Sequence, residues 1–339
     1  MTPNTSPTPQ NIPEQAKEQL KFLFLAKHAL WKGGLHPEDG NHAIYHHEVR
    51  KSLENLGLNL SIADNLESLF EHPKVDLVFP ILNRCGFVNS EMMVPLLSNM
   101  HGIPYVGAGP IMRGIGDDKA MSKMLASHVG VPTAPWFCYR RGAPINESDC
   151  PKADRWVIKP NASSASWAIS DAYSWSDVSR RITELHEEGH DVIVEPYLDG
   201  LDVQAAFLSV DGPKALPMLI YEREDTQTLW TYDQKRDLIA SNEKASLQLL
   251  EQSDLATKIG VMASKIAREF DPFDYGRIEF RLNRDTGEVN FIEINLNCNL
   301  WSEKVVAKSA HMAGFSHEQL LETILHEALR RNHLIPGNI

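Results

Sequence analysis

The sequence predicts an α/β protein that changes to an α+β arrangement in its C-terminal part. In the first third of the chain, short apolar runs alternate with segments of helical periodicity. This alternation is typical of right-handed βαβ units around a parallel sheet. Two later hairpin signals, Asp211–Gly212 and Thr286–Gly287, favour antiparallel pairing instead. A length of 339 residues exceeds one ordinary core and predicts two or three domains.

The first predicted domain covers residues 18–115 and contains the alternating elements. The expected strands are Phe22–Ala26, Asn59–Ala63, Val75–Leu82 and Pro104–Gly109, and the expected helices are His42–Gly57 and Ser90–His101. Residues 1–17 precede this domain and are rich in Pro, Thr and Asn. They lack the basic start and apolar core of a signal peptide, so we expect a disordered tail.

A central subdomain over residues 116–202 and a C-terminal subdomain over 203–339 are expected to follow. Their expected helices are Asp117–Gly130, Ser176–Glu188, Ala245–Phe270, Glu303–Ala313 and Ser316–Arg331, and their expected strands include Val157–Lys159, Asp191–Leu198, Ile278–Leu282 and Val289–Ile294. The polar stretch Glu222–Lys244 has too little periodicity to assign. A segment of this length in a compact domain is typical of a functional loop or lid.

Composition and charge narrow the class of protein. Hydrophobic residues make up 42% and charged residues 23% of the chain, which is an ordinary globular mixture. The net charge of −12 argues against binding nucleic acid, although a few lysines in a cleft would suffice for a small anion. The four cysteines form no C-x-x-C pair, and no apolar run approaches the roughly 20 residues of a membrane span. We therefore expect a soluble cytoplasmic protein with no nucleic-acid or membrane partner.

The hairpin near the C-terminal end carries the clearest chemical signal. Side chains alternate along a strand, so Arg277 and Glu279 lie on one face of the first strand of the hairpin. Glu293 and Asn295 likewise lie on one face of the second strand. If the two strands pair, an arginine, two carboxylates and an amide converge. Such oxygen ligands suit Mg²⁺, which completes its shell with phosphate oxygens and water. An ion pair of Arg277 with one of the glutamates is an equally good interpretation of these residues alone.

Two lysines and two acids earlier in the chain suggest a nucleotide site. Lys119 follows a glycine-containing turn, and Lys159 ends an apolar strand before the small-residue loop NASSAS. A lysine beside exposed backbone N–H groups can hold phosphate, although a lysine at a strand end is more often solvated. Glu195 could accept from an adenine amino group and Asp202 from ribose hydroxyls. Taken singly, each acid is better explained as an edge-strand carboxylate facing water.

The order of these features resembles the ATP-grasp superfamily, and within it the D-alanine–D-alanine ligase branch. The order is two lysines, the acid Glu195, a polar lid with YDQK, then R-x-E and E-x-N. The resemblance runs from about Phe22 to Leu329 and is strongest from Lys119 onward. It implies an ATP-grasp fold preceded by a Rossmann-like pre-ATP-grasp domain, and it implies ATP and a pair of Mg²⁺ ions as cofactors.

The resemblance also assigns roles to individual residues. It implies that the ATP-binding residues are Lys119, Lys159, Ser166, Glu195, Leu198, Asp202 and Lys235. It implies that Glu279, Glu293 and Asn295 bind the metal and that Arg277 is catalytic, stabilising the oxyanion of a tetrahedral intermediate. The implied reaction joins a small-molecule carboxylate to an amine through an acyl phosphate. A homodimer formed through the first domain is also implied.

The substrate motifs depart from that branch. The segment LNCNLWSEKV replaces T-x-P-G-M-T-S-H-S-L, so Lys304 stands where a serine binds the second amino acid. Arg236 replaces the lid tyrosine, Asn83 opens the replacement for H-G-x-x-G-E-D-G, and the early G-G-x-S-x-E is missing. We therefore expect the protein to join an amino acid to another small carboxylate or amine in a specialised natural-product pathway. The short segment after Asn295 is also similar to mycosporine-amino-acid ligases.

Other interpretations remain open at the level of sequence. One is a genuine D-alanine–D-alanine ligase of cell-wall synthesis, and another is a non-catalytic ATP-grasp protein that only binds nucleotide. His42 and His46 lie four residues apart on a predicted helix with Glu48 nearby, which permits a metal site. A solvated helix face explains the two histidines better.

Overall fold

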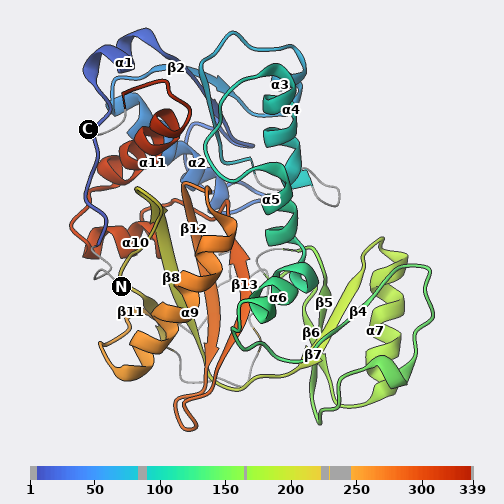
Figure 1. The fold of residues 1–339 in the computed structure, drawn as a ribbon. Helices are drawn as coiled ribbons and strands as arrows, with labels where there is room; N and C mark the ends of the chain where they lie inside the picture. Colours follow the sequence, from blue (N-terminus) through green and yellow to red (C-terminus); the bar gives the residue numbers. More distant parts are fainter. Residues whose placement is uncertain (1–5, 83–89, 164–165, 223–228, 230–245, 337–339) are drawn as a thin grey trace.

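The computed structural model describes residues 6–82, 90–163, 166–222, 229 and 246–336, which form three sheets with helices packed against them (Figure 1). The helices of the described residues are α1 (Glu14–Gln19), α2 (His42–Asn55), α3 (Glu67–Phe70), α4 (Met93–His101), α5 (Pro110–Asp117), α6 (Lys119–His128), α7 (Trp175–Glu187), α9 (Asp254–Phe270), α10 (Val305–Met312) and α11 (His317–Arg331). The strands are β1 (Lys21–Leu25), β2 (Asn59–Ala63), β3 (Leu77–Pro80), β4 (Phe137–Tyr139), β5 (Trp156–Pro160), β6 (Ser170–Ala172), β7 (Val192–Pro196), β8 (Leu201–Ser209), β9 (Pro213–Ala215), β10 (Leu219–Glu222), β11 (Ser246–Leu249), β12 (Tyr275–Leu282) and β13 (Val289–Asn295).

The first sheet is parallel, in the order β2-β1-β3. The central strand β1 has the sequence KFLFL and buries its last four residues, as expected for a parallel sheet that is covered on both faces. The connection from β1 leads into α2, and α4 ends at Gly102, whose left-handed φ of 66° favours glycine. The parallel pairing predicted from the alternating pattern is therefore confirmed for β1, β2 and β3.

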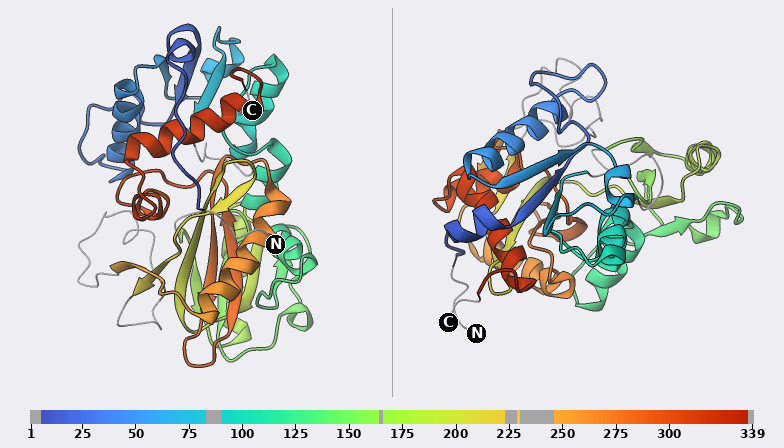
Figure 2. Two further views of the ribbon diagram at one scale, coloured as in Figure 1. Left: turned by 60° about the vertical axis from the view of Figure 1, so that its left-hand side comes forward. Right: turned by 90° about the horizontal axis from the view of Figure 1, so that it is seen from above.

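The largest sheet is antiparallel, in the order β11-β10-β8-β12-β13 with β9 beside β8. Alternate residues of β8 face two different cores, as the period of two requires. Val203 and Phe207 pack with apolar residues of α9, whereas Ala206 and Leu208 pack with apolar residues of α10 and α11. The same core continues into the first sheet, so α11 lies between the two sheets and beside α2 (Figure 2).

The third sheet has the antiparallel order β4-β7-β5-β6 and carries α7 on one face (Figure 1). Ser174 caps α7 by accepting the N–H of Asp177, and Val178, Ile182 and Leu185 bury one side of the helix. The sheet places Lys159 on β5 and Glu195 on β7, two residues that the sequence selected for a nucleotide site.

Several expectations about single elements are confirmed and others are wrong. Both hairpins form, β8–β9 around Asp211–Gly212 and β12–β13 around Thr286–Gly287. The continuous helix expected over Ala245–Phe270 is wrong, because Ser246–Leu249 alternates and pairs with β10, and α9 begins only after its cap Ser253. The strand expected over Pro104–Gly109 is reduced to a single bridge between Val78 and Tyr105.

The tail is ordered over its described part. Disorder was expected over residues 1–17, but Ile12 is buried and its N–H donates to Glu322 of α11 at 3.0 Å. The N–H of Gln10 donates to Thr323 Oγ1 at 2.9 Å, and α1 begins at Glu14. These backbone bonds to a distant helix could not be read from the composition of the segment. The boundaries predicted after residues 115 and 202 stay predictions.

Candidate functional site

The β12–β13 hairpin brings the four predicted residues of the metal site together. Arg277 lies opposite Asn295 and Glu279 lies opposite Glu293 in the antiparallel register. The Asn295 amide donates to Glu279 Oε1 at 3.0 Å and to Glu293 Oε1 at 3.1 Å. Arg277 donates to Glu279, so the alternative ion pair also exists, but within the cluster rather than in place of it. The arrangement gathers two carboxylates whose oxygens suit a hard divalent cation.

The surroundings of this cluster are largely withdrawn from water. Burial alone would lower the pKa of Arg277, but the charge of Glu279 together with further negative groups raises it, so the guanidinium stays charged. Gln204 of β8, which the sequence analysis missed, donates to Glu279 Oε2 at 3.2 Å. Two buried atoms have no hydrogen-bond partner among the described residues: the acceptor Oε1 of Gln204 and the donor Nε of Arg277. Such polar atoms are costly unless a ligand satisfies them.

Lys119 connects the hairpin with the small-residue loop. Lys119 is 4% exposed, and its ammonium donates to the Ser163 carbonyl at 2.7 Å and lies 3.6 Å from Glu293 Oε2. The backbone N–H of Ala120 donates to Asn161 Oδ1 at 3.0 Å, which fixes the start of α6 against the loop. A buried cation therefore stands between the loop and the carboxylates, where it can meet an anionic ligand.

Glu195 lies between two lysines rather than at a solvated edge. It pairs with Lys159, as the shared sheet allows, and its Oε2 lies 2.8 Å from the ammonium of Lys123. Burial raises the pKa of Glu195, but the two lysines outweigh it and lower the pKa to about 2. Lys123 also donates to Thr133 Oγ1 at 2.8 Å. Lys123 was not predicted as a site residue, although its spacing of four from Lys119 on one helix was a usable signal.

Arg281 organises the two remaining nucleotide candidates. Its guanidinium donates to the Leu198 carbonyl at 3.0 Å and to Asp202 Oδ1 at 2.8 Å. Arg281 was not predicted as a site residue, although it continues the alternation of Arg277 and Glu279 along β12. Asp202 is thus held in place by a cation instead of simply facing water.

The segment after Asn295 is anchored to α2. Glu48 accepts from Trp301 Nε1 at 3.0 Å, from the Ser302 N–H at 2.9 Å and from Ser302 Oγ at 3.0 Å. Lys304 places its ammonium 5.5 Å from the centre of the Trp301 ring. Cys298 is buried, and burial raises the pKa of its thiol to about 12, which leaves it no role as a nucleophile.

Some predicted residues lie outside the described part of the chain. Lys235 and Arg236, predicted to lie in a lid, and Asn83, predicted to contact substrate, belong to this group. Ser166 is described and has a left-handed φ of 58°, which is uncommon for a residue other than glycine. In the described part of the chain, no helix is both long and apolar enough to cross a membrane.

Comparison with known proteins decides the family. A family model described as the D-ala D-ala ligase C-terminus matches residues 125–326. The chain belongs to the D-Ala–D-Ala ligase family. The match covers β12, β13 and most of the described nucleotide candidates, and it confirms the resemblance on which the sequence analysis relied. The expected enzyme class, ATP-grasp ligases that form carbon–nitrogen bonds, is confirmed at the level of the family.

Relatives and solved structures of the D-Ala–D-Ala ligase family agree with this assignment. An uncharacterised protein of Sinorhizobium fredii is 30% identical over 70% of this chain and 70% of its own length. A D-alanine–D-alanine ligase of Acetivibrio thermocellus is 24% identical over 76% of this chain and 69% of its own. The crystal structure of the Bacillus anthracis D-alanine–D-alanine ligase complexed with ATP superposes with a TM-score of 0.71 at 18% identity, covering 93% and 99% of the two chains. The predicted ATP-grasp fold is thereby confirmed.

Proposed function

We propose that this protein is an ATP-dependent ligase that joins a carboxylate to an amine through an acyl phosphate. The convergence of Arg277, Glu279, Glu293 and Asn295 on one hairpin, with Lys119 beside Glu293, carries the proposal. A protein that only bound nucleotide would not need a half-buried arginine beside metal-type carboxylates. This arrangement supports turnover over the non-catalytic alternative.

ATP and Mg²⁺ fit the residues that are present. Glu279, Glu293 and the Asn295 side chain supply oxygens, and the buried, unpartnered Gln204 Oε1 lies beside Glu279. Bound Mg²⁺ would offset negative charge on the phosphates during phosphoryl transfer. We assign the phosphate side of ATP to Lys119, Lys159, Ser166 and Lys235, and the nucleoside side to Glu195, Leu198 and Asp202. We expect a pair of Mg²⁺ ions on Glu279, Glu293 and Asn295.

The chemistry proceeds in two displacements. A substrate carboxylate oxygen attacks the γ-phosphorus of ATP, the bond to the bridging oxygen breaks, and ADP leaves. An amine then attacks the acyl carbon. The bond between the acyl carbon and the phosphate oxygen breaks, inorganic phosphate leaves, and the amine nitrogen loses a proton. Arg277 is placed to stabilise the tetrahedral oxyanion, since a fixed charge in a water-poor site acts strongly.

We propose that the substrates are an amino acid and another small carboxylate or amine in a specialised pathway. The support is the altered segment after Asn295, where Trp301 and Ser302 are tied to Glu48 and Lys304 stands in place of a serine. We include Lys304, Arg236 and Asn83 in the substrate site. A genuine D-alanine–D-alanine ligase is the second candidate, because several relatives carry that name.

Release of ADP tests these functions directly. The full-length protein is mixed with MgATP and either D-alanine, single amino acids, pairs of amino acids, or acid–amine pairs, and products are identified by mass spectrometry. We expect one class of pair other than D-alanine with itself to raise ADP release and yield a condensed product. D-Ala–D-Ala as the preferred product would establish the second candidate. ATP binding without turnover on any pair would contradict the ligase.

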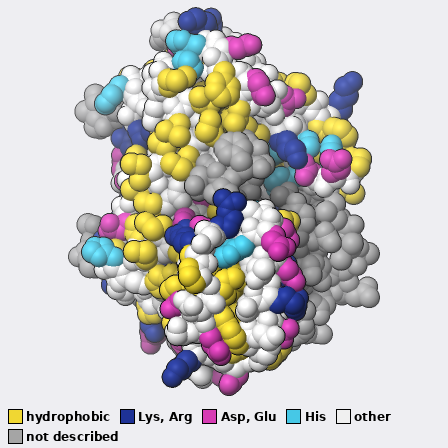
Figure 3. Space-filling view, turned by 90° about the vertical axis from the view of Figure 1, so that its right-hand side faces the viewer, with side chains coloured by type: hydrophobic (Ala, Val, Ile, Leu, Met, Phe, Trp, Pro, Cys, Tyr) yellow, Lys and Arg dark blue, Asp and Glu magenta, His cyan; other side chains and the backbone are white. Residues whose placement is uncertain are grey.

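We also propose a cytoplasmic homodimer. The face that carries α3, α4 and α5 exposes apolar side chains, which supports association through the first domain (Figure 3). The exposed residues of this face include Phe70, Leu96, Met100 and Ile111. Sedimentation of the purified chain at several concentrations tests the oligomeric state.

A further inference from the structure

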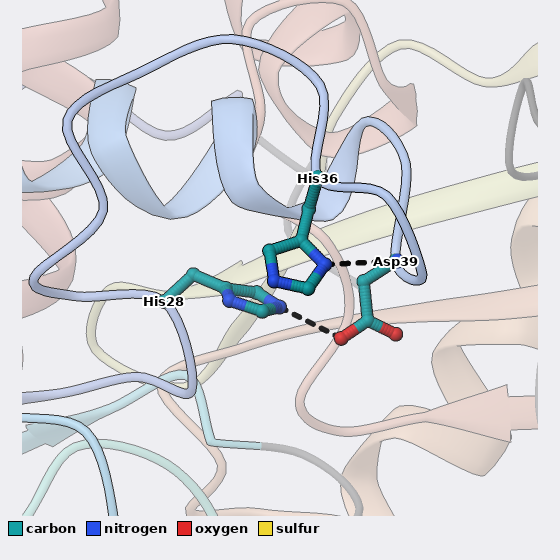
Figure 4. A group of neighbouring side chains, drawn as sticks. All are labelled: His28, His36 and Asp39. Atoms are coloured by element: carbon teal, nitrogen blue, oxygen red, sulfur yellow. Dashed lines mark hydrogen bonds and ion pairs between the residues drawn. The ribbon is translucent and has the colours of Figure 1, made fainter.

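The connection between β1 and α2 gathers three side chains of the kind that bind transition metals (Figure 4). His28 lies near its start, and His36 and Asp39 lie near its end. His28 Nε2 is 2.7 Å from Asp39 Oδ2, and the ring centres of His28 and His36 are 4.5 Å apart. One ligand atom from each residue lies within 4.8 Å of the other two. In the described part of the chain, no other group of three such residues lies as close together.

The surrounding residues hold these ligands in place. The backbone N–H of His28 donates to Nδ1 of His46, a buried histidine of α2, at 3.1 Å. The sequence suggested that His46 belongs to a solvated helix face, and this interpretation is wrong because the side chain is buried. The side chain of His28 is 8% exposed and that of Asp39 is 16% exposed. The bond to His46 thus fixes the backbone of His28 against α2, and the two ligand side chains lie mostly out of water.

Hydrogen bonding shows which nitrogen of His36 is unprotonated. The backbone N–H groups of Glu38 and Asp39 donate to His36 Nδ1 at 3.2 and 3.3 Å, so Nδ1 carries the lone pair and accepts both bonds in this structure. A metal ion at Nδ1 would take the place of these two N–H groups, which lie at the long end of the hydrogen-bond range. Figure 4 shows this side chain directed toward Asp39 and His28.

The Asp39 carboxylate already attracts cations. Lys27 pairs with the same oxygen that contacts His28, and its side chain is 55% exposed. An exposed lysine can turn into solvent at little cost, because surface ion pairs are weak. The ammonium of Lys27 therefore competes with a metal ion for Asp39 without filling the site permanently.

We propose that His28 Nε2, His36 Nδ1 and the Asp39 carboxylate bind one Zn²⁺ ion. Two imidazoles and one carboxylate suit Zn²⁺, whereas Mg²⁺ prefers oxygen ligands alone. Three protein ligands leave one position of a tetrahedral ion open to water or a ligand. The site shares no residue with the carboxylate cluster of the β12–β13 hairpin, and it would join the two ends of the connection between β1 and α2.

Metal binding to the full-length protein tests this site without any turnover. The protein is treated with EDTA, dialysed, and titrated with Zn²⁺ by calorimetry in the presence of excess Mg²⁺ and without nucleotide. We expect one Zn²⁺ per chain, and Co²⁺ in its place should give the visible absorption of a tetrahedral site. His28→Ala and Asp39→Asn should each weaken binding at least about 100-fold, since loss of a supporting residue alone costs 10–100-fold.

A variant with the opposite expected effect guards against loss of folding. Lys27→Met removes the competing ammonium and should tighten Zn²⁺ binding several-fold, with unchanged circular dichroism. His128→Ala, at the exposed end of α6, and Glu293→Gln, in the hairpin, are controls that should bind Zn²⁺ as the natural protein does. Absence of stoichiometric Zn²⁺ binding, or binding unchanged by both Lys27→Met and Asp39→Asn, would overturn the proposal. Either result leaves the proposed ligase activity untouched, because no substrate is present.

Discussion

Glu293 is the residue at which the two halves of the candidate site meet. Its carboxylate accepts from Asn295 on its own strand and lies 3.6 Å from the ammonium of Lys119, which reaches back to the small-residue loop. The side chain is 24% exposed, so it is sheltered yet open to a ligand. A carboxylate in this position can share a cation with Glu279 across the strand pair, and its negative charge attracts that cation more strongly than a neutral amide of equal size.

Replacement of Glu293 by glutamine should therefore abolish turnover while the fold stays intact. The change keeps the shape and one acceptor oxygen, but it replaces the other oxygen with a donor and removes the negative charge that favours a metal ion. We expect kcat to fall by at least about 100-fold, because metal stabilisation of the transition state supplies several kcal/mol. The measurement is ADP release with the substrate pair found active, together with thermal unfolding. Glu14→Gln, at a side chain that is 84% exposed, is the matched control, and full activity of Glu293→Gln would remove the metal assignment.

Cys298 should resist alkylation in the native protein. Burial raises the pKa of its thiol to about 12, so the reactive thiolate is scarce at pH 8, and the side chain is 6% exposed. Iodoacetamide followed by peptide mass spectrometry should label Cys298 slowly in buffer and rapidly in urea. Rapid native labelling that also inactivates the enzyme would show instead that this thiol is accessible and close to the chemistry.

At the scale of elements, the hairpin was predictable and its partners were not. The alternation in Arg277–Glu279 and Glu293–Asn295 is local, so a single sequence contains it. Gln204 and Arg281 enter the site only because β8 pairs with β12, which is a long-range choice that no local pattern records. The same reason explains Ser246–Leu249, where four alternating residues became a strand because β10 was available to pair with them.

Another unpredicted link between elements joins α2 to the segment that follows β13. Glu48 accepts three hydrogen bonds from Trp301 and Ser302, and a carboxylate acceptor strengthens each one. Because Glu48 supports the segment that carries Lys304, we expect it to influence substrate binding indirectly.

Glu48→Ala should loosen this segment and weaken substrate binding more than catalysis. We expect about 1–3 kcal/mol less stability to urea, the cost of leaving its partners unsatisfied. We also expect a higher KM for the substrate held near Lys304, with a smaller change in kcat and in KM for ATP. Glu54→Ala is the matched control, because Glu54 lies on the same helix and pairs with Lys51 at the surface. This change should alter neither the stability to urea nor the KM for the substrate. Equal effects on the KM values of all substrates would indicate a general loss of structure instead.

At the scale of the whole molecule, Asp274 joins three distant parts of the chain. It is 2% exposed, accepts the N–H of Gly107 at 2.6 Å, and pairs with Arg331 of α11 at 2.6 and 3.1 Å. Arg331 also donates to the carbonyl of Tyr105 at 3.0 Å. The residues before β12, the loop between α4 and α5, and the helix α11 are thereby held together around the buried carboxylate of Asp274.

Burial raises the pKa of Asp274 above its ordinary value, even though Arg331 acts to lower it. The folded state thus binds the proton of this carboxyl more tightly than the unfolded state does. For a carboxyl of this kind, stability falls as the pH rises between the two pKa values. Removing Arg331 deletes the main charge that opposes this rise, so the pKa of Asp274 in the folded state should rise further. The pH range over which stability changes should then move toward neutral pH.

Arg331→Met should consequently destabilise the protein most at neutral or alkaline pH. We expect a loss of about 3–5 kcal/mol there, the cost of an unpaired buried charge, and a distinctly smaller loss near pH 5, where Asp274 can take up a proton. Urea unfolding of both proteins across this pH range measures the difference. Arg180→Met, which breaks surface pairs on α7, should cost little at any pH. A loss for Arg331→Met that stays constant with pH would mean that packing of α11, rather than the charge of Asp274, dominates this junction.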